Sequence, residues 1–464
     1  MINCLDYRGD LTNESAVASR LVEAGLSESW AASKAELLNK SVSTLNVKSS
    51  RDSSSDLSAF FVPGRIEVLG KHTDYVGGSS LLAAAEQGFV IACVPRDDSI
   101  VRVTDACRGE TIEFPFDSEI VPTVGEWSNY PMTVARRMAR NFPEANRGAE
   151  IAFGSDLPPA SGMSSSSAMI VAFFLALAEA NRIWELPQFK ANVTSPVELA
   201  SYLATNENGQ NFGPLEGDRG VGTAGGSEDH TAILCCRPGM LSRYAYCPAR
   251  HVCDVELPEA YTFVIASSGV VAEKTGAAME AYNRASRLAG IAAEVWREAT
   301  GRDDPHLAAA IASCSGDTSE VRRVLGAASL GGRDVKHAEL LVRFDHFCRE
   351  NEEIQPVAVA ALQSSDMAAF GRAVEESQKA AEDLLGNQIA ETEFLAVEAR
   401  QLGAAAASAF GAGFGGSIWA LVEQTRADDF IAGWQDVYAR KFPEHDESSQ
   451  FFRTGAGPCA IRFL

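Results

Sequence analysis

The sequence has few positive charges for its length, and this excludes one class of partner. Its 464 residues carry 40 Lys and Arg against 62 Asp and Glu, a formal net charge of -22 at pH 7. Proteins that bind the phosphate backbone of a nucleic acid need clustered basic residues to displace counterions. We therefore expect no nucleic-acid partner, although a small anionic ligand can still bind at a local site.

Long apolar runs and paired cysteines are also missing. No stretch of about 18 or more unbroken apolar residues appears, so we expect no membrane span. The N-terminus MINCLDYRGDLTNES is too acidic and polar for a secretory signal, which predicts a cytoplasmic protein. Ten cysteines are scattered without a CxxC pair, and we interpret them as buried free thiols in a reducing compartment.

Length and composition predict two domains that share a cleft. A typical domain has about 150 residues, and 46% hydrophobic residues are enough for ordinary cores. Residues 1–58 are expected to form a helical extension and a serine-rich link. Short apolar runs predict an N-terminal lobe over residues 59–260, and helices between strands predict a C-terminal lobe over residues 261–464. The expected fold class is α+β with mixed sheets.

The segment PPASGMSSSSAM, residues 158–169, is the strongest local signal. A glycine loop followed by serines at a helix start offers backbone N–H groups, the positive end of the helix dipole and hydroxyls to a phosphate. The segment lacks the Gly-Lys-Ser/Thr of a Walker loop. Taken alone, it is equally well interpreted as a serine-rich helix cap.

Two further segments carry weaker signals. FGAGFGGSIWALV, residues 410–422, places four glycines before a strand, where the backbone either approaches a ligand closely or only makes a tight turn. VGTAGGSEDHTAILC, residues 221–235, places Glu228, Asp229 and His230 after a glycine pair. A carboxylate at this corner either takes a proton from a hydroxyl or only stabilises a helix start.

The segment PGRIEVLGKHTDYVGG places Arg65, Lys71, His72 and Asp74 where an apolar strand meets a glycine corner. In this order and at these wide separations, the segments resemble the GHMP small-molecule kinases, and within them the galactokinases. The corner resembles the galactokinase N-terminal motif, the serine segment resembles the phosphate loop, and FGAGFGG resembles the third motif.

The resemblance extends over residues 59–464. SSDMAAFGRAVEESQKAAEDL, residues 364–384, is similar to the galactokinase C-terminal helix pair. The resemblance implies a two-lobed GHMP kinase fold and an ATP-dependent transferase that acts on a small-molecule sugar, with no membrane partner. In such a kinase the γ-phosphate of ATP passes to the anomeric hydroxyl of a hexose.

The resemblance also implies roles for individual residues. Asp229 matches the catalytic aspartate that accepts or orients the hydroxyl proton, and Arg65 matches the arginine that balances the developing charge. The family's loop around the nucleotide phosphates corresponds to Gly162, Ser164, Ser165 and Ser166. The family's oxygen ligands of Mg²⁺ correspond to Ser166 and Glu207. The family's sugar-binding positions correspond to Lys71, His72, Asp74 and Tyr282.

Lys71 is the sharpest departure from the family pattern, because galactokinases have glutamate there, near the C6 end of the sugar. Replacing that glutamate by lysine removes an acceptor for the 6-hydroxyl of the sugar. The positively charged donor that takes its place favours a carboxylate at C6, as in galacturonic acid. Three alternatives stay open. Lys71 pairs with Glu67 or another acid and the substrate is galactose, or it reaches a nucleotide phosphate, or it is a solvated side chain.

Other departures touch the expected active-site wall. GGSEDH replaces the usual Cys-Gly-Ile-Met-Asp-Gln, Ala160 replaces a glycine of the phosphate loop, and Ser408 and Phe410 replace an arginine and a threonine of the third motif. An insertion near residues 211–222 separates Glu207 from Asp229. Two other classes stay open, a sugar and ATP sensor without turnover and a GHMP kinase for another alcohol, although the HTDY motif disfavours the latter.

Overall fold

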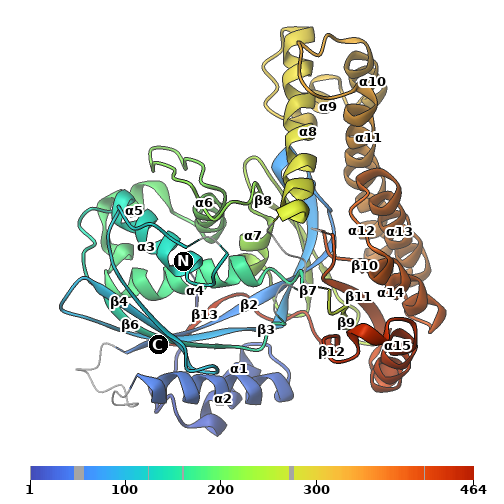
Figure 1. The fold of residues 1–464 in the computed structure, drawn as a ribbon. Coiled ribbons are helices and arrows are strands. Elements are labelled where there is room, and N and C mark those ends of the chain that lie inside the picture. Colours follow the sequence, from blue (N-terminus) through green and yellow to red (C-terminus); the bar gives the residue numbers. More distant parts are fainter. Residues whose placement is uncertain are drawn as a thin grey trace.

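Two β-sheets with helices packed against them organise the chain in this computed structural model (Figure 1). The arrangement confirms the expected α+β class with mixed sheets. The serine-rich link expected near residues 46–56 lies outside the residues that the structure describes, which are 2–45, 57–123, 125–158, 161–270, 276–411 and 413–463. Within these ranges, every helix is too short or too polar to cross a bilayer.

The first sheet runs in the order β1-β13-β2-β3-β6-β4-β5, with β7 beside β3 and β8 beside β7. It is mixed, since β2 and β3 pair antiparallel whereas β4 and β6 pair parallel. Its strands are β1 Asn3–Leu5, β2 Ser58–Leu69, β3 Ser79–Pro95, β4 Ile100–Asp105, β5 Thr111–Pro115, β6 Ala149–Ser155, β7 Met240–Ala245, β8 Arg250–Glu256 and β13 Ile461–Phe463. All of β2 is buried because helices cover both faces of the sheet.

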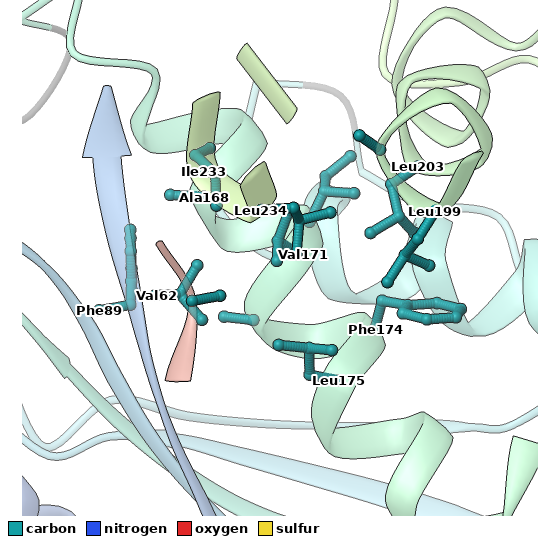
Figure 2. Close-up of a cluster of buried hydrophobic side chains, with 14 of the residues drawn as sticks. Val62, Phe89, Ala168, Val171, Phe174, Leu175, Leu199, Leu203, Ile233 and Leu234 are labelled. Atoms are coloured by element: carbon teal, nitrogen blue, oxygen red, sulfur yellow. The ribbon is translucent and has the colours of Figure 1, made fainter. Parts of the chain in front are cut away.

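A long apolar helix, α4, packs against one face of this sheet. The sequence of α4 is apolar almost all round, as expected for a helix buried on every side. Helix α4 spans Ser165–Ala180. Its neighbouring helices are α3 Asn129–Asn141, α6 Pro196–Asn208 and α7 Glu228–Cys235. Figure 2 shows side chains of α4, such as Val171 and Phe174, between the strands and the helices α6 and α7. This packing fixes where α4 and α7 begin.

The predicted N-terminal helices are α1 Glu14–Glu23 and α2 Glu28–Thr44, which cover the opposite face of the sheet. Lys34 of α2 is fully buried there and forms an ion pair with Asp156, while its ammonium lies 4.9 Å from the ring centre of Trp30. Asp156 also accepts a hydrogen bond from the backbone N of Gly88 at 2.9 Å. Because Asp156 lies just after β6, the extension is tied to the strand that leads into the phosphate loop.

The second sheet is antiparallel, in the order β10-β11-β9-β12. Its strands are β9 Tyr261–Ser267, β10 Ala406–Ala409, β11 Ser417–Glu423 and β12 Gln450–Thr454. The helices α14 Ala390–Gln401 and α15 Ala427–Lys441 pack against it. We propose the lobe boundary near residue 260, since β9 opens the second sheet, with β13 returning to the first.

Helices fill the chain between β9 and β10, as the sequence predicts. The segment from α8 to α11 forms an arm that projects from the body (Figure 1). These helices are α8 Gly276–Thr300, α9 Leu307–Ser313, α10 Thr318–Ala327, α11 His337–Cys348, α12 Gln355–Gln363 and α13 Met367–Ala380. Two π-helical turns, η3 Arg349–Ile354 and η4 Ala381–Leu385, follow α11 and α13. Shorter elements are α5 Pro187–Asn192 and the 3₁₀ turns η1 Asp74–Val76, η2 Ile183–Glu185, η5 Gln424–Arg426 and η6 Pro443–His445.

All ten cysteines are free thiols in the structure. The prediction that they are buried is wrong for Cys4, Cys107 and Cys247, which are exposed. Five are buried, and burial raises the pKa of the Cys348 thiol to about 12.

The pair between Lys34 and Asp156 is expected to contribute to folding stability. Replacing Lys34 by Met leaves Asp156 without its cation, and breaking a largely buried pair in this way costs about 3 kcal/mol. We expect that loss in the free energy of unfolding measured by urea denaturation. The double variant Lys34→Met/Asp156→Asn is expected to recover part of it. Lys40→Met, on the exposed side of α2, is the control, and an equal loss there would contradict the interpretation.

Candidate functional site

A cavity of about 1020 Å³ brings together the segments that the sequence singles out. Arg65, Gly162, Asp229 and Gly411 line it, one from each of the four segments. These residues are as much as 346 positions apart in the chain, from 65 to 411. Cavities that gather distant polar residues in this way are the usual sites of ligand binding.

The corner after β2 is built by a left-handed glycine. Gly70 has φ +115°, and a Cβ atom there would lie 2.6 Å from the backbone of Ser80, so only glycine fits. The backbone N of Gly70 donates a hydrogen bond to Glu350 at 2.7 Å, and Arg343 donates to the carbonyl of His72. Helix α11 and turn η3 of the C-terminal half therefore hold the corner in place.

Arg65 and Asp229 meet on the wall of the cavity. Asp229 lies in the first turn of α7, and its Oδ1 accepts a hydrogen bond from Nε of Arg65 at 2.6 Å. Nη1 of Arg65 donates to the carbonyl of Gly162 in the phosphate loop at 3.0 Å. Burial lowers the pKa of Arg65, but the carboxylates of Asp229, Glu67 and Glu228 raise it by more. The guanidinium therefore stays charged.

The serine segment forms a loop that leads into α4, as predicted. Gly162 has φ +77° and Ser164 has φ 60°, so the loop turns sharply before the helix begins at Ser165. Ser164, Ser165 and Ser166 all line the cavity beside the helix N-terminus. The side chain of Ser164 makes no capping hydrogen bond, which weighs against a plain helix cap. Ala160 lies outside the described residues.

Ser166 and Glu207 lie together, and this donor set fits a hard cation. Oγ of Ser166 donates to Oε1 of Glu207 at 3.2 Å, and Oγ of Ser167 donates to Oε2 at 2.6 Å. His230 approaches the same carboxylate, with Nε2 at 3.4 Å from Oε2. Among the described residues, His, Cys, Asp and Glu form no group of three or more that could hold a metal. Mg²⁺ needs no such group, because it keeps waters and substrate phosphates as ligands.

His72, Asp74 and Tyr282 line the cavity together, and we call this part the sugar end because the family resemblance assigns these residues to the sugar. The rings of His72 and Tyr282 lie 5.1 Å apart, and Nδ1 of His72 lies 2.6 Å from the hydroxyl of Tyr75. Asp74 accepts hydrogen bonds from the backbone N of Tyr75 at 2.9 Å and of Glu228 at 3.3 Å. Burial, and then the charge of Asp229, raise the pKa of Asp74 to about 6.

Lys71 does not belong to the cavity lining. It is fully buried, and its Nζ donates to Oγ of Ser377 on α13 at 2.9 Å. The alternative of a solvated side chain is therefore wrong. Glu67 forms its ion pair with Arg65, at 3.0 Å, rather than with Lys71. Contact between Lys71 and a substrate thus has no support from this geometry.

Sequence reasoning assigned no role to several polar residues of the cavity, among them Glu67 and Ser167. The signal for Glu67 was its position two residues after Arg65, since alternate strand residues share a face. Ser167 donates to Glu207 and also, at 3.3 Å, to Oδ2 of Asp229.

The insertion near residues 211–222 also reaches the cavity, where Arg219 and the next three residues line it. Arg136 of α3 holds the insertion through an ion pair with Asp218. Arg137 donates to the carbonyl of Gln210 at 2.9 Å. The loop between α6 and α7 is therefore a fixed part of the cavity wall.

Three family models match separate parts of the chain. The galactokinase galactose-binding signature matches residues 51–95. The GHMP kinases N terminal domain matches residues 129–215, and the GHMP kinases C terminal model matches residues 358–440. The order of these matches along the chain is that of the corner after β2, the phosphate loop and the C-terminal helices.

Curated relatives of the chain are galactokinases, and a solved galactokinase structure shares its fold. A galactokinase from Chloroflexus aggregans is 29% identical over 383 residues, which are 81% of this chain and 87% of the relative. One from Actinobacillus pleuropneumoniae is 28% identical over 388 residues, 82% and 89% of the two chains. The crystal structure of Lactococcus lactis galactokinase complexed with galactose matches the fold with a TM-score of 0.69 and 24% identity, covering 87% of this chain and 94% of that one.

More distant kinases share only the fold. The structure of Methanococcus jannaschii mevalonate kinase matches with a TM-score of 0.53 and 11% identity, covering 87% of this chain and 99% of that one. The family models give the chain the N-terminal and C-terminal domains of GHMP kinases together with the galactokinase galactose-binding signature, and the curated relatives it resembles are galactokinases.

Proposed function

We propose that this protein is an ATP-dependent sugar 1-kinase that transfers the γ-phosphate of ATP to the anomeric hydroxyl of galactose or a closely related neutral hexose. The observation that carries the proposal is the contact between Arg65 and Asp229 on the wall of a cavity that the phosphate loop also lines. Phosphoryl transfer requires mainly positioning, charge stabilisation and an oriented nucleophile, and these groups supply each of them.

Each group of the wall has one task in this reaction. Asp229 accepts the proton of the attacking hydroxyl, and Arg65 keeps that carboxylate ionised and balances charge on the phosphoryl oxygens. The backbone of the loop at Gly162 and the hydroxyls of Ser164 and Ser165 hold the nucleotide phosphates. Ser166 and Glu207 would hold Mg²⁺, which neutralises phosphate charge when it is bound.

The acids of the sugar end support a neutral sugar rather than a uronate. Glu67, Asp74 and Asp229 line the cavity, and Lys71 does not. A C6 carboxylate would meet like charges there, which disfavours its binding. The galacturonate alternative, which rested on Lys71, therefore has less support than galactose.

A sensor without turnover is the second candidate, and the intact wall weighs against it. Asp229, Arg65 and Glu207 are all present and hydrogen-bonded, as catalysis requires. We also propose that the protein acts in the cytoplasm, where ten free thiols are compatible with a reducing environment.

The variant Asp229→Asn tests catalysis directly. An amide has no basicity at neutral pH, so the variant should bind sugar and ATP but release ADP at least about 10²-fold more slowly. A coupled ADP assay measures turnover, and isothermal titration measures sugar binding. Asp303→Asn, at an exposed position outside the cavity lining, is the control. A wild-type protein that binds both ligands without releasing ADP would establish the sensor.

A panel of galactose, galacturonate and arabinose tests the substrate. We expect kcat/KM to be highest for galactose, and lower for galacturonate by about tenfold or more because of the acids of the sugar end. The same coupled assay, run at saturating ATP, gives all three values. Better turnover of galacturonate would mean that Lys71 leaves Ser377 to face the ligand.

The raised pKa of Asp74 predicts an acidic limb for sugar binding. Its pKa of about 6 means that the carboxylate gains a proton as the pH falls through that value. A protonated Asp74 is a poorer acceptor for a sugar hydroxyl, so KM for the sugar should rise below about pH 6. Asp74→Asn should show a higher KM that no longer changes over this range. An acidic limb that persists unchanged in the variant would assign it to another group.

A further inference from the structure

Three carboxylates crowd the single guanidinium of Arg65. Its Nε lies 2.6 Å from Oδ1 of Asp229 and 3.6 Å from Oε1 of Glu228, and its Nη2 lies 3.0 Å from Oε2 of Glu67. Arg65, Glu67 and Glu228 are all buried, at 5%, 2% and 5% exposure. Asp229 is partly exposed, with 24% of its side chain accessible, but one positive charge still does not balance its carboxylate and two buried carboxylates, so one of the buried acids must be neutral or otherwise compensated.

The hydrogen bonds identify which acid is neutral. Within the part of the chain that the structure describes, no N–H or hydroxyl donates to the buried Oε1 of Glu67. Both Glu67 and Glu228 lie against Arg65, at 3.0 Å and 3.6 Å from its nitrogens, and their carboxyl groups are close enough to interact with each other. A carboxylate cannot donate to another carboxylate, so this contact is favourable only if one of the pair carries a proton.

Glu228 is the member of the pair that holds the proton. Glu67 faces Arg65 at 3.0 Å, which favours its ionised form, whereas Glu228 lies farther from the guanidinium. Ser80 donates a hydrogen bond to Oε2 of Glu228, which fixes the side chain. Burial first, and then the charge of Glu67, raise the pKa of Glu228 well above its usual range.

The groups around Glu228 come from three elements and from the residue that follows β7. The titratable or charged groups that face it are Arg65 and Glu67 of β2, Asp74 and Tyr75 of η1, Tyr246 just after β7, and its neighbour Asp229 on α7. Arg65 is the cation of this set. The remaining charges are acidic and disfavour a second charge on the pair.

We propose that Glu228 stays protonated in the working enzyme and donates a hydrogen bond to Glu67, and that this carboxyl–carboxylate pair positions Arg65 against Asp229. Glu67 and Glu228 are then positioning residues for the kinase reaction, and their role rests on the proposed function. Loss of the proton leaves Glu228 as a second anion near Nε of Arg65, where it competes with Asp229 for the same donor.

The proposal predicts an alkaline limb in kcat that depends on Glu228. In the wild type, kcat should fall by about tenfold or more once the pH rises through the pKa of the pair. The amide of Glu228→Gln donates like the protonated acid and cannot lose a proton. At the plateau, the kcat of this variant should be reduced by less than about tenfold relative to the wild type. Over the alkaline range, its kcat should stay within about twofold of that plateau value.

The variant Glu67→Gln tests the other partner. Its amide donates to Glu228 and stabilises the ionised form, so Glu228 competes for Arg65 already at neutral pH. We expect kcat to fall by about tenfold while KM for the sugar changes by less than about threefold. A merely structural role would instead lower thermal stability and leave the shape of the pH profile unchanged, and Asp303→Asn should alter neither.

Infrared spectroscopy of the unmodified protein tests the proton itself. At about pH 8, where Asp74 is ionised, the wild type should show the carbonyl stretch of a protonated carboxylic acid that Glu228→Gln lacks. An unchanged alkaline limb in Glu228→Gln, or the absence of that band, would overturn the pair. A wild type that shows the band but no ADP release would overturn the kinase reaction and leave the pair standing.

Discussion

The buried guanidinium of Arg65 is the charge on which the rest of the site depends. A cation at 5% exposure is stable only if anions and carbonyls surround it, and here three segments of the chain supply them. Strand β2 provides Glu67, the phosphate loop provides the carbonyl of Gly162, and helix α7 provides Asp229. These contacts draw the start of α7 and the loop before α4 to the same strand, so the groups that phosphoryl transfer needs are assembled as a consequence of neutralising one side chain.

The sugar end depends in turn on helices far along the chain. Glu350 of η3 accepts a hydrogen bond from the backbone N of Gly70, and Gln355 of α12 donates one to the carbonyl of Ser79 at 2.6 Å. Both sides of the glycine corner are therefore held by these two elements. Lys71 adds a side-chain contact to Ser377 of α13. Lys71 therefore joins the corner to the C-terminal helices, and the acids of the cavity lining, such as Glu67 and Asp74, come from other positions.

Local pattern predicted the elements and the order of the motifs, because strands, helices and glycine corners follow from periodicity and turn chemistry. The family resemblance, rather than local pattern, predicted that Arg65 and Asp229 act in the same active site. Local pattern could not predict which way the side chain of Lys71 points. Its partner Ser377 lies 306 positions away in the sequence, and a residue just after a strand can point to either face of the sheet. The pairing of Glu67 with Glu228 was hidden for the same reason, since each acid alone reads as an ordinary strand or helix-start carboxylate.

The pair of acids also gives the glycines of the third motif a physical reason. A Cβ atom at Gly411 would lie 2.2 Å from Oε2 of Glu67, so the carboxylate of Glu67 would have to move. Any larger residue there would push Glu67 off Nη2 of Arg65, and the guanidinium would lose the anion that holds it towards Asp229. The glycine run is therefore more than a tight turn. It leaves room for the carboxylate that orients Arg65, so the first and third motifs depend on each other through that one charge.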